Sequence, residues 1–117
     1  MNNSEMHELS IAENLLRQVK GIVRGERLVG VFAIALKVGA LRQIVPETLQ
    51  EAFASLAAGT AAAGAKIEIE TIPPRVRCRD CGKEKDGFLA ACPSCKSVRI
   101  DLIAGRELFI DYIEGDR

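Results

Sequence analysis

The chain of 117 residues is long enough for one ordinary domain or two small lobes, and with 48% hydrophobic and 27% charged residues it has a globular rather than a disordered composition. Its 16 basic and 16 acidic residues leave no net charge, so the chain as a whole has no electrostatic attraction to nucleic acid or to an anionic membrane. The apolar runs are interrupted or too rich in alanine to cross a bilayer, and no secretory signal is recognisable, so we expect a cytoplasmic protein.

A helix and a strand are predicted in the first third of the chain. Ser10 and Glu13 have the spacing of a capping box, and apolar residues then recur at helical intervals as far as Gly25, which predicts a helix over residues 10–24. Residues 28–38 are β-branched and aliphatic at both alternating sets of positions. This pattern predicts a strand that is covered on both faces.

A second helix and two further strands follow. Pro46 is well placed as the first residue of a helix over residues 46–58, and residues 66–72 alternate charged with aliphatic side chains, as in a strand with one solvated face. A proline pair at 73–74 stops further pairing and indicates a boundary. The last apolar run, residues 107–113, reads as a closing strand that returns to the first sheet.

The order of these elements predicts an α+β fold. It consists of a small three-stranded sheet with two helices, plus an inserted zinc-ribbon-like lobe between the last two strands. We expect residues 1–73 and 106–117 to form one α+β domain and residues 74–105 to form the inserted lobe.

All the cysteines of the chain lie in the inserted lobe, as two CxxC pairs: Cys78 with Cys81, and Cys92 with Cys95. Ten residues separate the pairs, enough for a hairpin that folds one pair onto the other. Four thiolates suit zinc and fill its coordination shell, which favours a structural role over catalysis. Disulfides, an iron centre and a redox thiol pair are the alternatives.

The one histidine, His7, lies just ahead of the first predicted helix, in Met6-His7-Glu8. A lone surface histidine is usually incidental, although imidazole is a common ligand for nickel, copper and zinc. If a chain began at Met6, its amine, the following backbone amides and the imidazole would be able to surround one cation in the square-planar nitrogen geometry of Ni(II) or Cu(II).

Several segments together resemble the HypA/HybF family of nickel metallochaperones for hydrogenase maturation. They are Met6-His7-Glu8-Leu9-Ser10, Val38-Gly39-Ala40-Leu41, Gly59-Thr60 with Gly64-Ala65, the two cysteine pairs, and Gly105-Arg106-Glu107-Leu108 with Ile113-Glu114. The resemblance covers nearly the whole chain. The order of the Met-His-Glu segment, both cysteine pairs and the closing strand makes it specific.

The resemblance implies a carrier, not an enzyme, that takes up one Ni(II) ion and delivers it to the large-subunit precursor of [NiFe]-hydrogenase, with a nickel-handling GTPase as partner and, in some members, urease as a second recipient. It implies nickel binding by His7, with Met6 and Glu8 contributing backbone nitrogen. It assigns the zinc ligands to Cys78, Cys81, Cys92 and Cys95. Family members usually begin at the methionine of the motif, whereas five residues precede it here, so a start at Met6 is a hypothesis.

Two other classes of function compete with a nickel carrier. A zinc-ribbon module that binds nucleic acid or protein is the alternative, but charge neutrality and the scarcity of aromatic residues argue against nucleic acid. A redox enzyme would need a thiol of low pKa and no zinc, and no catalytic triad or phosphate-binding loop is recognisable. The sequence leaves open whether the protein forms a homodimer.

Overall fold

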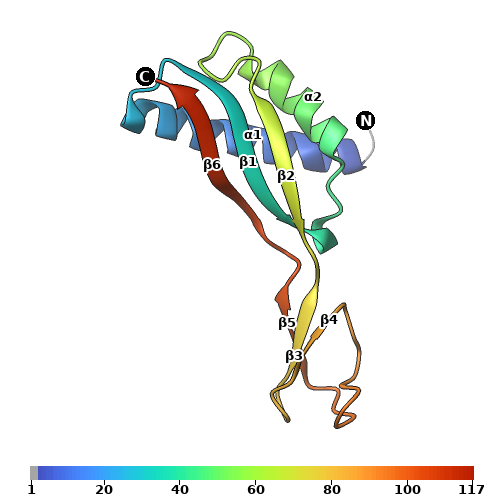
Figure 1. Ribbon diagram of the computed structural model, residues 1–117. Helices are drawn as coiled ribbons and strands as arrows, with labels where there is room; N and C mark the ends of the chain where they lie inside the picture. Colours follow the sequence, from blue (N-terminus) through green and yellow to red (C-terminus); the bar gives the residue numbers. More distant parts are fainter. Residues whose placement is uncertain (1–2) are drawn as a thin grey trace. The chain divides into compact units, whose positions relative to one another are not determined.

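The computed structural model describes residues 3–117, with side chains described from His7 onward. The elements follow one another along the chain as in Figure 1. They are α1 (Asn3–Glu26), β1 (Gly30–Gly39), a 3-10 helix η1 (Ala40–Arg42), α2 (Pro46–Ala57), β2 (Lys66–Ile72), β3 (Arg75–Cys78), β4 (Glu84–Asp86), β5 (Ile100–Ala104) and β6 (Leu108–Asp116).

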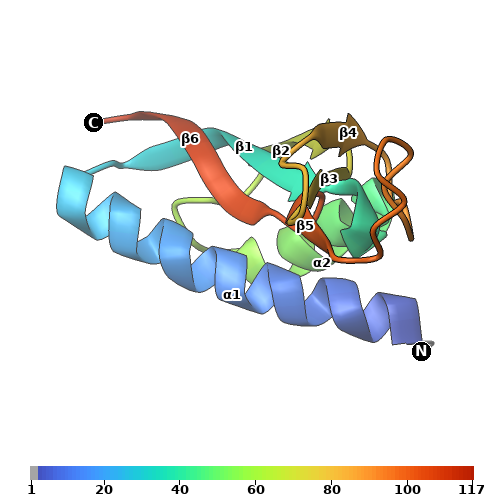
Figure 2. The ribbon, with the colours of Figure 1, turned by 90° about the horizontal axis from the view of Figure 1, so that it is seen from below.

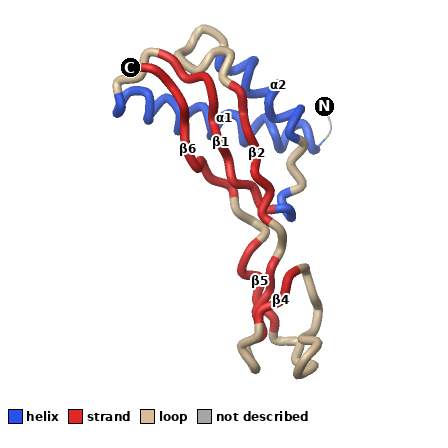
Figure 3. The backbone as a smooth tube through the Cα atoms, in the orientation of Figure 1, coloured by secondary structure: helices blue, strands red, loops and turns tan. Residues whose placement is uncertain are grey.

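The strands form two three-stranded sheets, which Figure 3 shows in red. The first sheet has the order β2-β1-β6, so the closing strand of the chain pairs with its first strand. The second sheet has the order β4-β3-β5, and β3 pairs antiparallel with both of its neighbours. The predicted α+β fold, with two helices, a three-stranded sheet and an inserted cysteine lobe, is confirmed. Neither helix of the described residues combines the length and apolar character that crossing a bilayer requires.

The chain divides into two compact units. The first comprises residues 1–36, 44–69 and 110–117, and the second comprises residues 37–43 and 70–109. The units divide the chain a few residues away from the predicted domain boundaries, and the second also takes in the end of β1 and η1.

The core of the first unit lies between the two helices and the sheet. Figure 2 shows α1 running along one face of the sheet, and α1 packs against α2. The largest fully buried apolar side chains come from both helices and from the central strand. They are Val19 of α1, Ile34 and Leu36 of β1, and Leu49 and Phe53 of α2. Burial of such side chains is worth roughly 1.5–3 kcal/mol each, so this unit has an ordinary hydrophobic core.

A side chain of α2 fixes the start of β2. Gln50 donates from Nε2 to the Ala65 carbonyl at 3.1 Å and accepts from the Ile67 amide at 2.7 Å. Both polar ends of one amide are therefore used to join a helix to a sheet edge, in addition to the apolar contacts of the same helix.

The predicted start of the first helix is wrong: α1 begins at Asn3, not at residue 10. The buried stripe of α1 continues upstream of Ser10, because the buried Glu8 lies one turn before Ala12 and two turns before Leu15, which are buried too. Burial of this turn overrides the local preference of Ser10 for a helix start. His7 therefore lies inside the helix rather than ahead of it.

The second unit contains a close backbone contact that excludes any side chain. Leu41 donates to the Gly105 carbonyl at 2.9 Å and Gly39 donates to the Glu107 carbonyl at 2.7 Å. A Cβ atom at Gly39 would lie 2.1 Å from the carbonyl carbon and oxygen of Gly105. Gly105 itself has φ 117°, a conformation that favours glycine.

We expect Gly39→Ala to lower the free energy of unfolding by about 2 kcal/mol or more, because two backbone segments would have to separate to admit one methyl group. Gly30→Ala at the other end of β1 is the matched control, since a Cβ there meets nothing within 4 Å. Its effect should stay within about 1 kcal/mol. Urea unfolding of both zinc-loaded variants measures the difference, and equal effects would contradict the steric argument.

Candidate metal centres

The four cysteines of the second unit come together as one cluster. The sulfur of Cys78 lies 3.5 Å from that of Cys95, the sulfur of Cys81 lies 3.6 Å from that of Cys92, and all four lie within 4.8 Å of one another. A zinc ion with four sulfur ligands at about 2.3 Å sets the edges of its tetrahedron at roughly 3.8 Å. All four cysteines are free, and a disulfide would need sulfurs about 2.05 Å apart. The donor set and its spacing therefore fit a tetrahedral zinc ion.

The two halves of the cluster have the same local backbone. In the first, the Cys81 amide points at the Cys78 sulfur at 3.5 Å and the Gly82 amide donates to the Cys78 carbonyl at 2.9 Å. In the second, the Cys95 amide points at the Cys92 sulfur at 3.5 Å and the Lys96 amide donates to the Cys92 carbonyl at 2.9 Å.

Each of these turns ends on a residue with positive φ, Gly82 at 77° and Lys96 at 65°. A left-handed residue is favourable for glycine and costs a lysine some free energy, so the second turn is held against a local preference. The repeated turn points one backbone amide at the first sulfur of each pair, which favours its thiolate form.

The backbone amides and the neighbouring sulfurs give thiols of the cluster different pKa values. The Cys81 amide lowers the pKa of Cys78, and the Cys95 amide is the main cause that lowers the pKa of Cys92 to about 6. The Ser97 amide also favours a thiolate at Cys95, but the neighbouring sulfurs, led by Cys78, and burial outweigh it and raise the pKa of Cys95 to about 12. Four adjacent thiolates thus need a cation to neutralise them.

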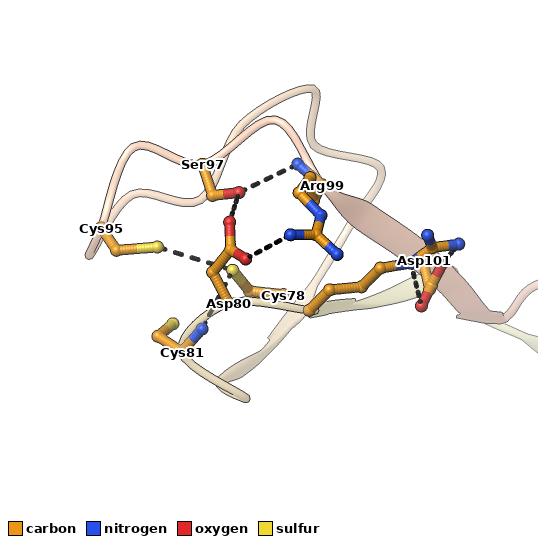
Figure 4. A network of polar contacts seen from close by, with 8 residues as sticks. Cys78, Asp80, Cys81, Cys95, Ser97, Arg99 and Asp101 are labelled. Carbon is orange, nitrogen blue, oxygen red and sulfur yellow. Dashed lines mark hydrogen bonds and ion pairs between the residues drawn. The ribbon is translucent and has the colours of Figure 1, made fainter.

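A polar network joins the two cysteine turns (Figure 4). Asp80, inside the first turn, accepts a hydrogen bond from the Ser97 hydroxyl and pairs with the Arg99 guanidinium at 3.1 Å. The Ser97 hydroxyl in turn accepts from the Arg99 amide at 3.0 Å. One carboxylate therefore fixes the chain that leaves the second turn.

A second ion pair lies next to this network. Arg79 contacts Asp101 through Nη2 at 2.7 Å, which raises the pKa of the guanidinium and lowers the pKa of the carboxyl group. Because both side chains are more than 40% exposed, the pair contributes little to stability and acts mainly to orient neighbouring strands.

The cysteine lobe has almost no apolar interior. Among the described residues from 70 to 109, the buried apolar side chains are those of Val76, Cys78 and Cys92. A lobe with so few buried side chains gains little from the hydrophobic effect, and metal-ligand bonds commonly supply the folding energy of such small lobes.

His7 lies apart from any group of potential ligands among the described side chains, and its imidazole is exposed on α1. The side chain of Met6 lies outside the described part of the chain. An exposed imidazole remains accessible to a metal ion and to a partner protein.

Glu8 was predicted only as a source of backbone nitrogen, yet it is the one buried charged residue among the described side chains, at 1% exposure. Neither of its carboxylate oxygens has a hydrogen-bond partner within the described residues. A buried carboxyl group without partners is costly, so a requirement other than stability is expected at this position. This burial could not be predicted from the sequence, because Glu8 precedes the predicted helix.

Comparisons with known proteins place the chain in one family. The family model described as "Hydrogenase/urease nickel incorporation, metallochaperone, hypA" matches residues 6–115. A hydrogenase maturation factor HypA of Moorella thermoacetica is 41% identical over 113 residues, which cover 95% of this chain and all of that protein. The HypA of Methanocaldococcus jannaschii is 40% identical over 115 residues, covering 90% of this chain and 93% of that protein.

Solved structures share the fold at lower sequence identity. A solution structure of a HypA protein has a TM-score of 0.75 at 17% identity and covers 94% of this chain and 96% of its own. The solution structure of the Ni metallochaperone HypA from Helicobacter pylori has a TM-score of 0.69 at 15% identity and covers 93% of this chain and 97% of its own. At these identities the likeness establishes the fold.

We expect Cys92→Ser to weaken zinc binding at least about a hundredfold, because a hydroxyl group replaces the thiolate that forms most readily. The neighbouring variant Ser94→Ala removes a hydroxyl that accepts from Lys83 at 3.4 Å, and should bind zinc as the unaltered chain does. Competition with a chromophoric chelator and elemental analysis measure both. Tight zinc binding by the Cys92→Ser variant would contradict a four-sulfur site.

The pKa values also predict how proton release depends on pH. At pH 7.5 the metal-free chain carries Cys92 as thiolate and Cys95 as thiol, so zinc binding must displace the Cys95 proton. As the pH falls towards 6, Cys92 becomes protonated too, and more protons should be released per zinc ion. Calorimetry in buffers of different ionisation enthalpy counts them, and a proton release that does not change with pH would contradict these assignments.

The same shifts affect the stability of the metal-free fold in opposite directions. The lowered pKa of Cys92 gives a contribution that is complete above pH 9 and is lost as the pH falls through 6. The raised pKa of Cys95 gives one that is complete below pH 9 and is lost as the pH rises through 12.

Proposed function

Because the chain belongs to the HypA family of metallochaperones for nickel incorporation into hydrogenase and urease, we propose that it binds one Ni(II) ion and delivers it for the maturation of a [NiFe]-hydrogenase. The ion is cargo, so the protein has no catalytic residues and acts as a maturation factor rather than an enzyme. A urease is a further possible recipient within the same family description.

The separation of the candidate ligands carries this proposal. Every sulfur ligand is committed to one cluster, where four thiolates leave a zinc ion without an open position. The single imidazole is exposed on a different unit of the chain. A shallow site at His7 can exchange its ion with a partner that offers better ligands, whereas a closed thiolate cage cannot.

The proposal divides the chain by task. Residues 1–73 and 106–117 bind nickel, with the His7 imidazole and the backbone nitrogens of Met6 and Glu8 as ligands. Residues 74–105 bind structural zinc through Cys78, Cys81, Cys92 and Cys95. Its partners are a nickel-handling GTPase and the hydrogenase large-subunit precursor, which receives the ion, in the cytoplasm.

The helix imposes a condition on nickel binding. In an α-helix each amide donates to the carbonyl four residues earlier, and only the first four amides are free. Because α1 begins at Asn3, the Met6 amide is one of the first four, but the Glu8 amide lies beyond them. Binding through the Glu8 nitrogen therefore requires the first turns to open, whereas in a helix that began at Met6 this nitrogen would be free.

We expect metal analysis after equilibration with Ni(II) to find one nickel and one zinc per unaltered chain, and zinc alone in His7→Ala, because the substitution removes the imidazole and leaves the cysteines untouched. Glu13→Ala, another exposed position of α1, is the control and should retain both ions. Full nickel binding by His7→Ala would exclude this site as the place of the cargo.

The same measurement on a version that begins at Met6 tests the role of backbone nitrogen. It should bind nickel more tightly than the chain that begins at Met1, because its amine and first amides need not leave a helix. Equal affinities would show that the backbone nitrogens are not ligands, even if His7 is.

A further inference from the structure

A preformed groove lies between α1 and the turn that follows α2. It has a volume of about 220 Å³ and is lined by Val19, Lys20, Val23 and Arg24 of α1 and by residues 60–62 of the turn. This volume is below the roughly 300–1,000 Å³ of typical small-molecule pockets. It is of the size that accepts one apolar side chain, and its lining contains no titratable group besides Lys20 and Arg24.

The turn wall of the groove is fixed by hydrogen bonds. The Thr60 hydroxyl donates to the Ala57 carbonyl at 2.6 Å and accepts from the Ala62 amide at 3.2 Å. The Val31 amide of β1 donates to the Ala61 carbonyl at 2.8 Å. The turn is therefore hydrogen-bonded both to the end of α2 and to β1. Binding of a ligand would not cost the conformational entropy of ordering this turn.

The rim of the groove is basic although the whole chain is neutral. Arg17, Lys20 and Arg24 are exposed and recur at i, i+3 and i+7, so they form one stripe along α1. Residues 14–25 contain these three cations and no acidic side chain. Since the chain is formally neutral, an excess of acidic side chains lies elsewhere, and the positive potential is local.

Within the described residues the stripe has no carboxylate partner. Arg17 donates to the neutral Asn14 side chain at 2.8 Å, and neither Lys20 nor Arg24 forms an ion pair there. Glu26, at the end of α1, is engaged by Arg117 at 2.9 Å. Arginines of the cysteine lobe, such as Arg79 and Arg99, do have carboxylate partners.

We propose that this groove is a docking site for an acidic peptide segment of a partner protein, which seats one apolar side chain against Val19 and Val23 and pairs its carboxylates with Lys20 and Arg24. An apolar anchor in a pocket supplies affinity, and the surrounding charges supply orientation and a faster encounter. The proposal uses neither His7 nor any cysteine, so it is independent of nickel and zinc binding.

The lining favours a peptide over other polyanions. It contains no aromatic side chain on which a base would stack, as proteins that bind single-stranded nucleic acid provide. It is also concave, whereas a helix that lies on a membrane projects large apolar side chains into the lipid. A second copy of the chain is the remaining source of acidic residues, and the test separates it from a foreign peptide.

The probe is a fluorescent peptide, Glu-Asp-Glu-Asp-Leu-Glu-Asp-Glu-Asp, with blocked ends, and binding to the full chain is followed by fluorescence anisotropy. We expect saturable binding that weakens with added salt, and amide chemical-shift changes confined to residues 17–24 and 60–62. The double variant Lys20→Gln with Arg24→Gln should bind about tenfold more weakly or worse, which corresponds to about 1.4 kcal/mol. Because both side chains are exposed, the variant should remain folded, which circular dichroism checks.

Two controls separate docking from general charge attraction. Lys66→Gln with Arg106→Gln removes the same charge from exposed side chains outside the groove and should change the dissociation constant less than twofold. Ala61→Leu fills the groove without changing charge and should weaken binding of the leucine peptide, but not of a peptide with serine in its place.

Equal binding by the groove variant and its charge control would overturn the proposal, as would equal affinity for the leucine and serine peptides. Tighter binding of an oligothymidylate or of phosphatidylserine vesicles, lost in the groove variant, would assign the surface to nucleic acid or membrane instead. A dimer in sedimentation that the groove variant dissociates would assign it to a second copy of this chain.

Discussion

Four sulfur atoms within 4.8 Å of one another are the constraint from which the organisation of the second unit follows. Thiolates at such distances repel each other, and the neighbouring sulfurs, led by Cys78, raise the pKa of Cys95 in the metal-free chain. The lobe has few buried apolar side chains to offset it, and its exposed ion pairs contribute little. A cation bound by the four sulfurs would neutralise this repulsion and supply folding free energy that the lobe otherwise lacks, in contrast to the first unit, which has a hydrophobic core.

This constraint also decides where a transferable ion can be held. A cluster that needs its cation for folding cannot give that cation away without losing structure, because the binding free energy is also folding free energy. A cargo site must then use different ligands on a part of the chain that is stable without metal. The first unit meets this condition, since α1 is held by buried residues of both helices and of β1, and the exposed His7 extends from it.

The sequence was sufficient for the parts of the fold that repeat with a clear period. Both helices, the three strands of the first sheet and the pairing of the cysteines into one cluster were predictable, because apolar periodicity and CxxC spacing are local signals. The start of α1 was not, because the burial of Glu8 depends on packing and the capping pattern at Ser10 is only a local preference. The strands of the cysteine lobe were missed because they are short and because β3 and β4 are rich in charge. The contact of Gly39 with Gly105 depends on residues far apart in sequence.

A net charge of zero predicts no long-range field, but it does not describe the surface at the scale of a binding site. At physiological salt the Debye length is about 8 Å, so a partner responds to the side chains within a few residues of its contact and not to the sum over the chain. Lys20 and Arg24 lie one helical turn apart beside an apolar groove, and no carboxylate of the described residues pairs with them. The turn at residues 60–62 forms one wall of the groove, and it packs against α1 only in the folded chain. The basic stripe of α1 therefore becomes the rim of a groove through a tertiary contact that the sequence alone does not indicate.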